Sequence, residues 1–152
     1  MRGGRLLTLP ALLIASLVAA SALAREPVWP SGLYSNVHSI EETGDILGME
    51  ARFFEDAGRH MVEFVWCEGW CNETFTVPVS RTPDGFAFSY FQRFADGGVD
   101  AGQTMRFLAW PEGRVLKISA WQGSEKLDQD GRPQRLRRAT KLSGIAMARS
   151  GN

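Results

Sequence analysis

Cys67 and Cys71 are the only cysteines of the chain, and they flank the three residues Glu68-Gly69-Trp70. In an exported protein, an even number of cysteines indicates disulfide bonds. Opposed residues of an antiparallel hairpin have Cα atoms about 4.5–5.5 Å apart, a separation that a disulfide spans. A redox-active pair would favour two intervening residues over three. The spacing therefore predicts a structural disulfide that holds the turn carrying Trp70, with a redox pair as the alternative.

The sequence offers no recognisable catalytic set. The only histidines are His38 and His60, and a metal site of the usual kind needs more His or Cys ligands than this chain provides. No serine lies in a Gly-x-Ser-x-Gly segment, and no glycine-rich phosphate loop follows a strand. His60 alternates in phase with Val62 and Phe64, so we expect an inward-pointing structural residue. We therefore predict neither an enzyme nor a bound cofactor or metal.

Glu41, Glu42 and Asp45 place three carboxylates in one turn. Calcium takes six or more oxygen ligands, so these three fall short unless another loop contributes. The ordinary interpretation is turn chemistry, in which the Asp45 side chain bonds its own backbone. We retain the three residues as candidates for binding a ligand or partner.

Tryptophans are the other candidate binding residues, and the chain has five: Trp29, Trp66, Trp70, Trp110 and Trp121. Aromatic side chains fill the interiors of small barrels well. Trp66 alternates in phase with His60 and Phe64 and fits that role. Trp70 lies inside a turn, where no core requires an aromatic ring, so it is the tryptophan expected to touch a partner.

The elements that position these residues are strands, because apolar residues recur at every second position from residue 32 onward. Turns rich in Gly, Asp and Pro separate the runs. The pattern predicts eight strands: 32–37, 47–53, 60–66, 75–79, 86–94, 105–109, 116–120 and 134–140.

Eight strands joined by short turns indicate an all-β, antiparallel, up-and-down meander, which can close into a barrel. A β-sandwich is the alternative, but its Greek-key crossings need long connections, and only 122–133 is long. We therefore expect a single β-barrel domain over 25–142. The residues 143–152 are expected to form a flexible C-terminal tail.

Residues 1–24 have the parts of a secretory signal peptide. Two arginines precede the apolar run 6–20, and Ala22 and Ala24 supply the small residues of a cleavage site before Arg25. The run is too short for a comfortable transmembrane helix. We therefore expect an exported protein, periplasmic or secreted, without a membrane span.

Four segments resemble small exported bacterial proteins of uncharacterised function: 32–37 (GLYSNV), 41–50 (EETGDILGME), 67–69 (CEG) and 77–79 (VPV). More distantly, the glycine-x-aromatic first strand is similar to that of lipocalin-like (calycin) barrels, with Tyr34 where the lipocalin motif has Trp. The resemblance covers roughly half of the mature chain. It implies a barrel and carries no known activity.

Charge is balanced overall, with 17 Lys and Arg against 17 Asp and Glu, which argues against a wholly basic nucleic-acid binder. In a meander, the first, third, fifth and seventh connections share one end of the sheet. That end collects nine acids against two bases: Glu41, Glu42, Asp45, Glu68, Asp96, Asp100, Glu125, Asp128 and Asp130 against Lys126 and Arg132. An acidic rim favours a cationic partner, although acids also keep an exported barrel in solution.

Two functions follow from these features. The leading one is a non-enzymatic exported barrel that binds a small apolar or amphipathic ligand, with Trp66 and Trp70 among its contacts. The alternative is a protein-interaction module, for example an inhibitor of a cationic hydrolase, that uses the acidic end with Asp128 and Asp130. An apolar cavity above about 300 Å³ would favour the first, and a filled interior would favour the second.

Overall fold

A computed structural model describes residues 26–93 and 102–151 of the chain. The predicted signal peptide and its cleavage site before Arg25 lie outside this range. So does the fifth connection, 95–101, with its two predicted rim acids Asp96 and Asp100.

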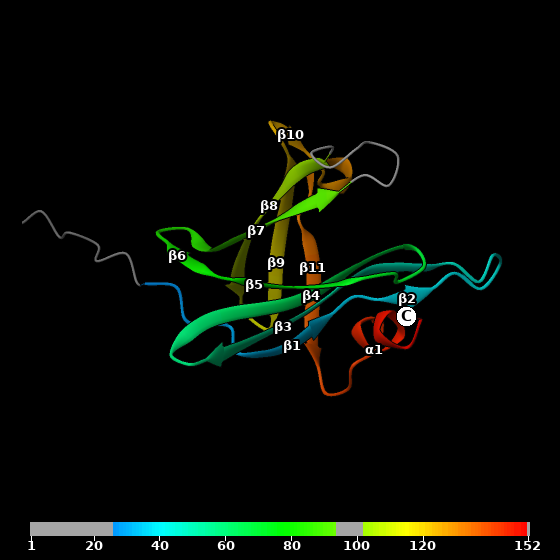
Figure 1. Cartoon of the computed structure of the whole chain (residues 1–152), viewed down its shortest axis with the longest axis horizontal. Coiled ribbons are helices and arrows are strands. Elements are labelled where there is room, and N and C mark those ends of the chain that lie inside the picture. Colours follow the sequence, from blue (N-terminus) through cyan, green and yellow to red (C-terminus); the bar gives the residue numbers. More distant parts are fainter. Residues whose placement is uncertain (1–25, 94–101, 152) are drawn as a thin grey trace, which may run out of the picture.

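The chain forms antiparallel strands over most of its described length (Figure 1). The strands are β1 (Gly32–Ser35), β2 (His38–Ser39), β3 (Ile46–Asp56), β4 (Arg59–Gly69), β5 (Thr74–Pro78), β6 (Ser80–Thr82), β7 (Gly85–Arg93), β8 (Gly102–Glu112), β9 (Val115–Gln122), β10 (Glu125–Lys126) and β11 (Gln134–Ala139). A short 3-10 turn, η1 (Gln129–Gly131), precedes β11, and a helix, α1 (Gly144–Ser150), ends the chain. Each of the eight predicted strands is present, the fourth (75–79) as β5, whereas the short strands β2, β6 and β10 were not predicted.

The strands pair in the order β5-β4-β3-β1-β11-β9-β8-β7-β6, and the sheet nearly closes into a barrel. The first and last strands of the chain, β1 and β11, pair with each other in the middle of this order. At the two ends, β5 pairs with β4 whereas β6 pairs with β7. Only Val79 separates β5 from β6, so one stretch of chain passes from β4 to β7. We call this junction the seam. Because the two ends of the sheet are joined in this way, the prediction of a barrel is confirmed in preference to a sandwich.

Inward-facing aromatic rings fill the centre of the barrel. Phe53, Phe64, Phe88 and Phe107 are each at most 5% exposed. The rings of Phe88 and Phe107 stack with centroids 4.9 Å apart. Burying one such side chain contributes about 1.5–3 kcal/mol. The centre of the barrel is therefore packed core.

Trp29, just before β1, covers one end of the barrel. Its ring stacks on that of His60, with centroids 4.0 Å apart. It meets Phe53 and Phe86 edge-on, at centroid distances of 5.6 and 5.3 Å. His60 also approaches Glu55, with Nε2 3.3 Å from Oε1. His60 thus lies inward and half-buried at this end, as its phase predicts.

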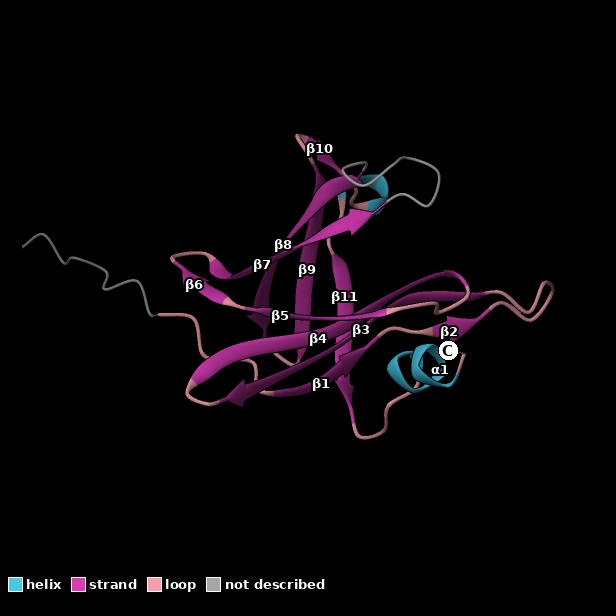
Figure 2. Ribbon diagram, in the orientation of Figure 1, coloured by secondary structure: helices cyan, strands magenta, loops and turns pink. Residues whose placement is uncertain are grey.

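The C-terminal segment forms the helix α1, so the prediction of a flexible tail is wrong. Figure 2 shows the helix against the outer side of the sheet, near β2. Ile145 and Ala148 are at most 1% exposed and pack with Val65 and Cys67 of β4. These two β4 residues face away from the barrel interior, and α1 removes them from water.

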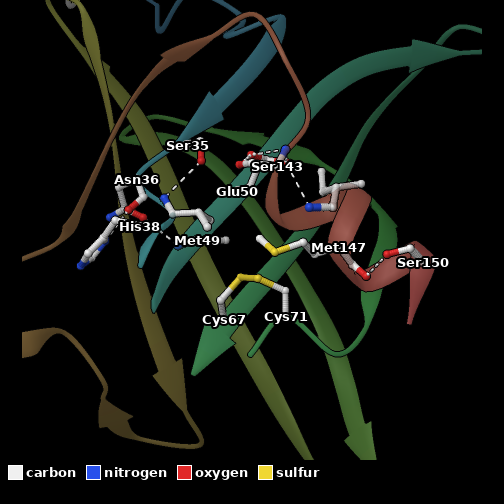
Figure 3. Close-up of a disulfide and its surroundings, with 12 residues drawn as sticks. Ser35, Asn36, His38, Met49, Glu50, Cys67, Cys71, Ser143, Met147 and Ser150 are labelled. Carbon is white, nitrogen blue, oxygen red and sulfur yellow. Dashed lines mark hydrogen bonds between the residues drawn. A yellow bond between two sulfur atoms is a disulfide. The ribbon is translucent and has the colours of Figure 1, made fainter. Parts of the chain in front are cut away.

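Two buried carboxylates on the outer face of the sheet fix α1 at both ends. Glu50 of β3 is fully buried and accepts hydrogen bonds from the backbone N–H groups of Ser143 and Ile145, at 3.0 and 3.1 Å (Figure 3). Glu63 of β4 is 3% exposed and accepts a hydrogen bond from Arg149 of α1. Because the helix is anchored by these bonds as well as by packing, it is a fixed part of the fold.

Candidate functional site

A cavity of about 550 Å³ opens at the end of the barrel opposite Trp29. Its walls come from the last residues of β4, β7 and β9, the first residues of β5 and β8, the connection between β4 and β5, and the segment after β10. The apolar lining residues are Trp66, Trp70, Phe75, Tyr90, Met105 and Leu127. The polar lining residues are Glu68, Asn72, Glu73, Gln92 and Gln122. We call this space the mouth cavity.

Aromatic rings form the inner side of the mouth cavity. Phe75 and Tyr90 stack across the seam, with centroids 4.0 Å apart. Trp66 lies 6.2 Å from Phe107, centroid to centroid, so the ring is continuous with the packed core. Trp66, Phe75 and Tyr90 are only partly buried. They therefore present aromatic surface to whatever occupies the cavity.

Trp70 is held over the mouth cavity by the disulfide turn. The predicted disulfide is confirmed: Cys67 and Cys71 are joined, with Cα atoms 4.3 Å apart. Gly69 adopts a φ of 82°, which favours glycine, and lets the Glu68 N–H donate to the Trp70 carbonyl at 3.1 Å. The half-cystines are at most 2% exposed, whereas Trp70 is 51% exposed.

The disulfide is buried beneath α1. Figure 3 shows the Met147 side chain of α1 pointing toward it. Cys67 and Cys71 belong to the same apolar cluster as Ile145 and Ala148. The helix and the disulfide together therefore fix the turn from which Trp70 projects.

The rim of the mouth cavity is acidic, and none of the lining residues that the structure describes is a base. Glu68 and Glu73 supply the two carboxylates, and both are exposed. Burial, followed by the negative charge of Glu73, raises the pKa of the Tyr90 phenol above its usual value. Tyr90 therefore keeps its proton at neutral pH and offers a hydroxyl at the cavity wall.

The predicted acidic turn lies at the same end of the sheet but outside the mouth cavity. Ile46 pairs with Gly69, so the residues before Ile46 extend beyond the disulfide turn. Glu41, Glu42 and Asp45 are exposed there. The Thr43 hydroxyl donates to Asp45 Oδ2 at 2.8 Å, which is ordinary turn chemistry.

Asp128 is an internal anchor, and Asp130 is exposed in η1. The Asp128 side chain is 1% exposed. It accepts hydrogen bonds from the Ser119 hydroxyl at 2.7 Å and the Ala120 N–H at 3.1 Å, and its Oδ2 lies 2.9 Å from Lys126 Nζ. Burial opposes ionisation, but these bonds hold the pKa of Asp128 below its usual value. The structure thus gives Asp128 a different role from the free rim charge expected from sequence.

Sequence reasoning missed Glu73, Gln92 and Gln122 as lining residues, although a signal was present. Each lies two positions away from an inward-facing residue of a strand and therefore faces the same side. Glu73 lies two residues before Phe75, and Gln92 lies two residues after Tyr90. Where the inward phase runs past the packed core, a polar residue replaces an apolar one. That change marks the open end of the barrel.

A second depression, of about 520 Å³, lies over the seam on the outside of the sheet. We call it the seam groove; Pro78, Ser80, Arg106 and Trp121 are among its lining residues. Phe88 and Phe107 also contribute to its floor, and both belong to the packed core. The seam groove therefore reaches the wall of the core, and it is the competing location for a ligand.

The described part of the chain offers neither a metal site nor a membrane-spanning helix. No group of three or more His, Cys, Asp or Glu side chains there is placed to hold a metal ion. No helix in the same residues is long and apolar enough to cross a membrane. No protein-family model, curated protein or solved structure matches the chain. The mouth cavity is therefore interpreted from its own geometry.

Proposed function

We propose that the protein binds a small amphipathic molecule in the mouth cavity and has no enzymatic role. The observation that carries this proposal is the convergence of aromatic and polar side chains from several strands on one cavity. At about 550 Å³, the cavity is within the usual range for small-molecule sites, about 300–1,000 Å³. Such sites combine apolar walls with a few polar groups that fix orientation.

The packed core excludes a ligand from the centre of the barrel, which is the outcome that favours an interaction module, but the mouth cavity leaves room for a ligand at one end. Because Phe64, Phe88 and Phe107 occupy the centre of the barrel, the ligand lies across the mouth. Its apolar part contacts Trp66, Phe75 and Tyr90, and its polar part faces the rim. In this proposal the chain is a distant relative of the lipocalin-like barrels.

The proposed place of action is outside the cytoplasm, in the periplasm or secreted. The Cys67–Cys71 disulfide supports it, because disulfides persist in oxidising compartments. The predicted signal peptide over residues 1–24 points the same way.

The test is binding of N-phenyl-1-naphthylamine, an uncharged fluorescent probe that brightens in apolar sites. Trp70→Ala should weaken its affinity about tenfold, since Trp70 lines the cavity and truncating an aromatic contact costs more than 1 kcal/mol. The matched control is Trp121→Ala in the seam groove, which should change the affinity less than twofold. Absence of probe binding, or loss of binding in the Trp121 variant alone, would overturn the proposal. Native mass spectrometry of gently purified protein would then look for a co-purified ligand.

A cationic protein partner is the second candidate, and the exposure of Trp70 favours it. The ring is 51% exposed beside a turn that carries Glu41, Glu42 and Asp45. A decalysine peptide should then bind at low ionic strength and be released by salt. Neutralising Glu41 and Glu42 with glutamine should weaken it. Failure of the peptide to bind at low salt would reject this candidate.

A further inference from the structure

The mouth cavity has one sign of charge. Among the described residues, Glu68 and Glu73 are its carboxylates, and no Lys, Arg or His lines it. Neither carboxylate forms an ion pair with a base among residues 26–93 and 102–151. Two uncompensated negative charges at the entrance of a cavity attract a cation and repel an anion.

The walls of the cavity are of the kind that binds organic cations. The negative face of an aromatic ring attracts an ammonium group within about 6 Å of its centroid. Trp70 and Trp66 flank Glu68 along the chain at a spacing of two residues, and Phe75 follows Glu73 at the same spacing. Each carboxylate thus shares the cavity lining with aromatic rings that come from the same strand or turn.

An inorganic cation fits this lining poorly. A hard metal ion takes six or more oxygen ligands in close array. The described residues contain no group of three acidic, histidine or cysteine side chains placed for that purpose. The cavity is also far larger than a metal ion, and four of its eleven lining residues are aromatic. A molecule with both an apolar body and a positive charge uses the whole surface.

We propose that the ligand of the mouth cavity is an organic cation of the substituted ammonium class. Its charged group lies at the rim, toward Trp70, Glu68 and Glu73. Its apolar body lies against Trp66, Phe75 and Tyr90. The amide side chains of Asn72, Gln92 and Gln122 provide oxygens for any ammonium hydrogens. This inference rests on the proposed function and adds the chemical class of the ligand.

The test compares three soluble probes with the same phenyl body: phenethylammonium, 2-phenylethanol and 3-phenylpropanoate. Their affinities are measured by NMR titration of the indole N–H signals at low ionic strength, each probe alone. The ammonium should bind about tenfold more tightly than the alcohol, and the carboxylate should bind most weakly. Raising the salt concentration should reduce the preference for the ammonium and leave the affinity for the alcohol unchanged.

Paired variants locate the charge effect. The double variant Glu68→Gln, Glu73→Gln should reduce the ammonium preference over the alcohol to less than threefold. Asp84→Asn removes an exposed acid from the opposite end of the barrel and should leave the preference intact. Asp84→Asn should also leave the binding of uncharged N-phenyl-1-naphthylamine unchanged.

The outcomes separate the two proposals. If the naphthylamine binds and the ammonium has no advantage over the alcohol, the inference of a cation is overturned and the proposed function stands. If 3-phenylpropanoate binds best, the inference is likewise overturned. If neither the naphthylamine nor any of the three probes binds, the proposed function fails with it.

Discussion

Replacing Asp128 by asparagine should destabilise the fold, although sequence alone suggests a rim charge for binding. The carboxylate is buried and receives hydrogen bonds from Ser119 and Ala120 of β9. Leu127, next to it, donates its N–H to the Ala120 carbonyl at 2.9 Å and lines the mouth cavity. Asp128 therefore ties the connection after β9 to that strand.

The magnitude follows from these contacts. A hydrogen bond to an ionised group contributes about 1.5–3 kcal/mol. The Lys126 side chain is 45% exposed, so its ion pair with Asp128 adds about 0–1 kcal/mol. Asparagine keeps one acceptor oxygen and loses the charge. We therefore expect Asp128→Asn to lower the free energy of unfolding by about 2 kcal/mol.

Urea unfolding at pH 7 measures this loss, with Asp130→Asn as the matched control. Asp130 is exposed two residues away, and its replacement should change stability by less than about 0.5 kcal/mol. With an m-value of about 2 kcal/mol/M, the midpoint should fall by about 1 M for Asp128→Asn. Equal midpoints for the two variants would refute the anchoring role of Asp128.

The pH dependence gives a second check on the same residue. Although burial opposes ionisation of Asp128, its hydrogen bonds hold its pKa in the folded state below the unfolded value of about 3.9. A lowered pKa stabilises the fold above the unfolded value, and this contribution is lost as the pH falls through the folded value. The stability difference between wild type and Asp128→Asn should therefore be full at neutral pH and shrink below pH 4. A difference that stays constant down to pH 2 would contradict the assignment.

Three further predictions concern the disulfide, the helix and export. Reduction of the disulfide should raise the intact mass by about two daltons, and free thiols in natively exported protein would show that the disulfide is absent. Replacing Cys67 and Cys71 by alanine should lower the free energy of unfolding in urea by about 2 kcal/mol without preventing folding. Ile145→Ala should lower the free energy of unfolding by about 2–5 kcal/mol and expose the C-terminal helix to proteases. Ala146→Ser, on the exposed side of the helix, should have little effect. Equal protease resistance of the two variants would show that the helix is not anchored. N-terminal sequencing of exported protein should begin at Arg25, and an intact N-terminus would contradict the signal peptide.

The strands were predictable from sequence because an antiparallel sheet with one packed face imposes a period of two. In β4, for example, Val62, Phe64 and Trp66 all face inward, as their alternation indicates. The disulfide was predictable for a local reason, since both cysteines flank one turn. The passage of the fourth strand from β4 to β7 at Val79 was not predictable, because it depends on the curvature of the whole sheet.

The helix α1 was missed because a segment of seven residues at the end of the chain is too short to show a helical period. The informative residues lie elsewhere in the chain. Val65 and Cys67 are apolar at outward positions of β4, and they require a cover that periodicity alone does not identify. Glu50, on the outer face of β3, completes the site that receives the helix. Such long-range complementarity becomes visible only when the strands are placed side by side.

The candidate site was predictable in part. The choice of the end carrying Trp66 and Trp70 followed from counting connections, and both residues line the mouth cavity. The environment of each acidic side chain was not predictable, because a carboxylate in a long connection can face solvent or accept hydrogen bonds from a neighbouring strand. Asp128 does the second, whereas Glu68 lines the cavity.

The most direct measurement of the central claim uses the five tryptophans as reporters. Their indole N–H signals can be assigned by single Trp→Phe substitutions and followed while N-phenyl-1-naphthylamine is added. Binding in the mouth cavity should shift the signals of Trp66 and Trp70 and leave that of Trp29, at the closed end, unchanged. A shift confined to Trp121, in the seam groove, or to Trp29 would contradict the account.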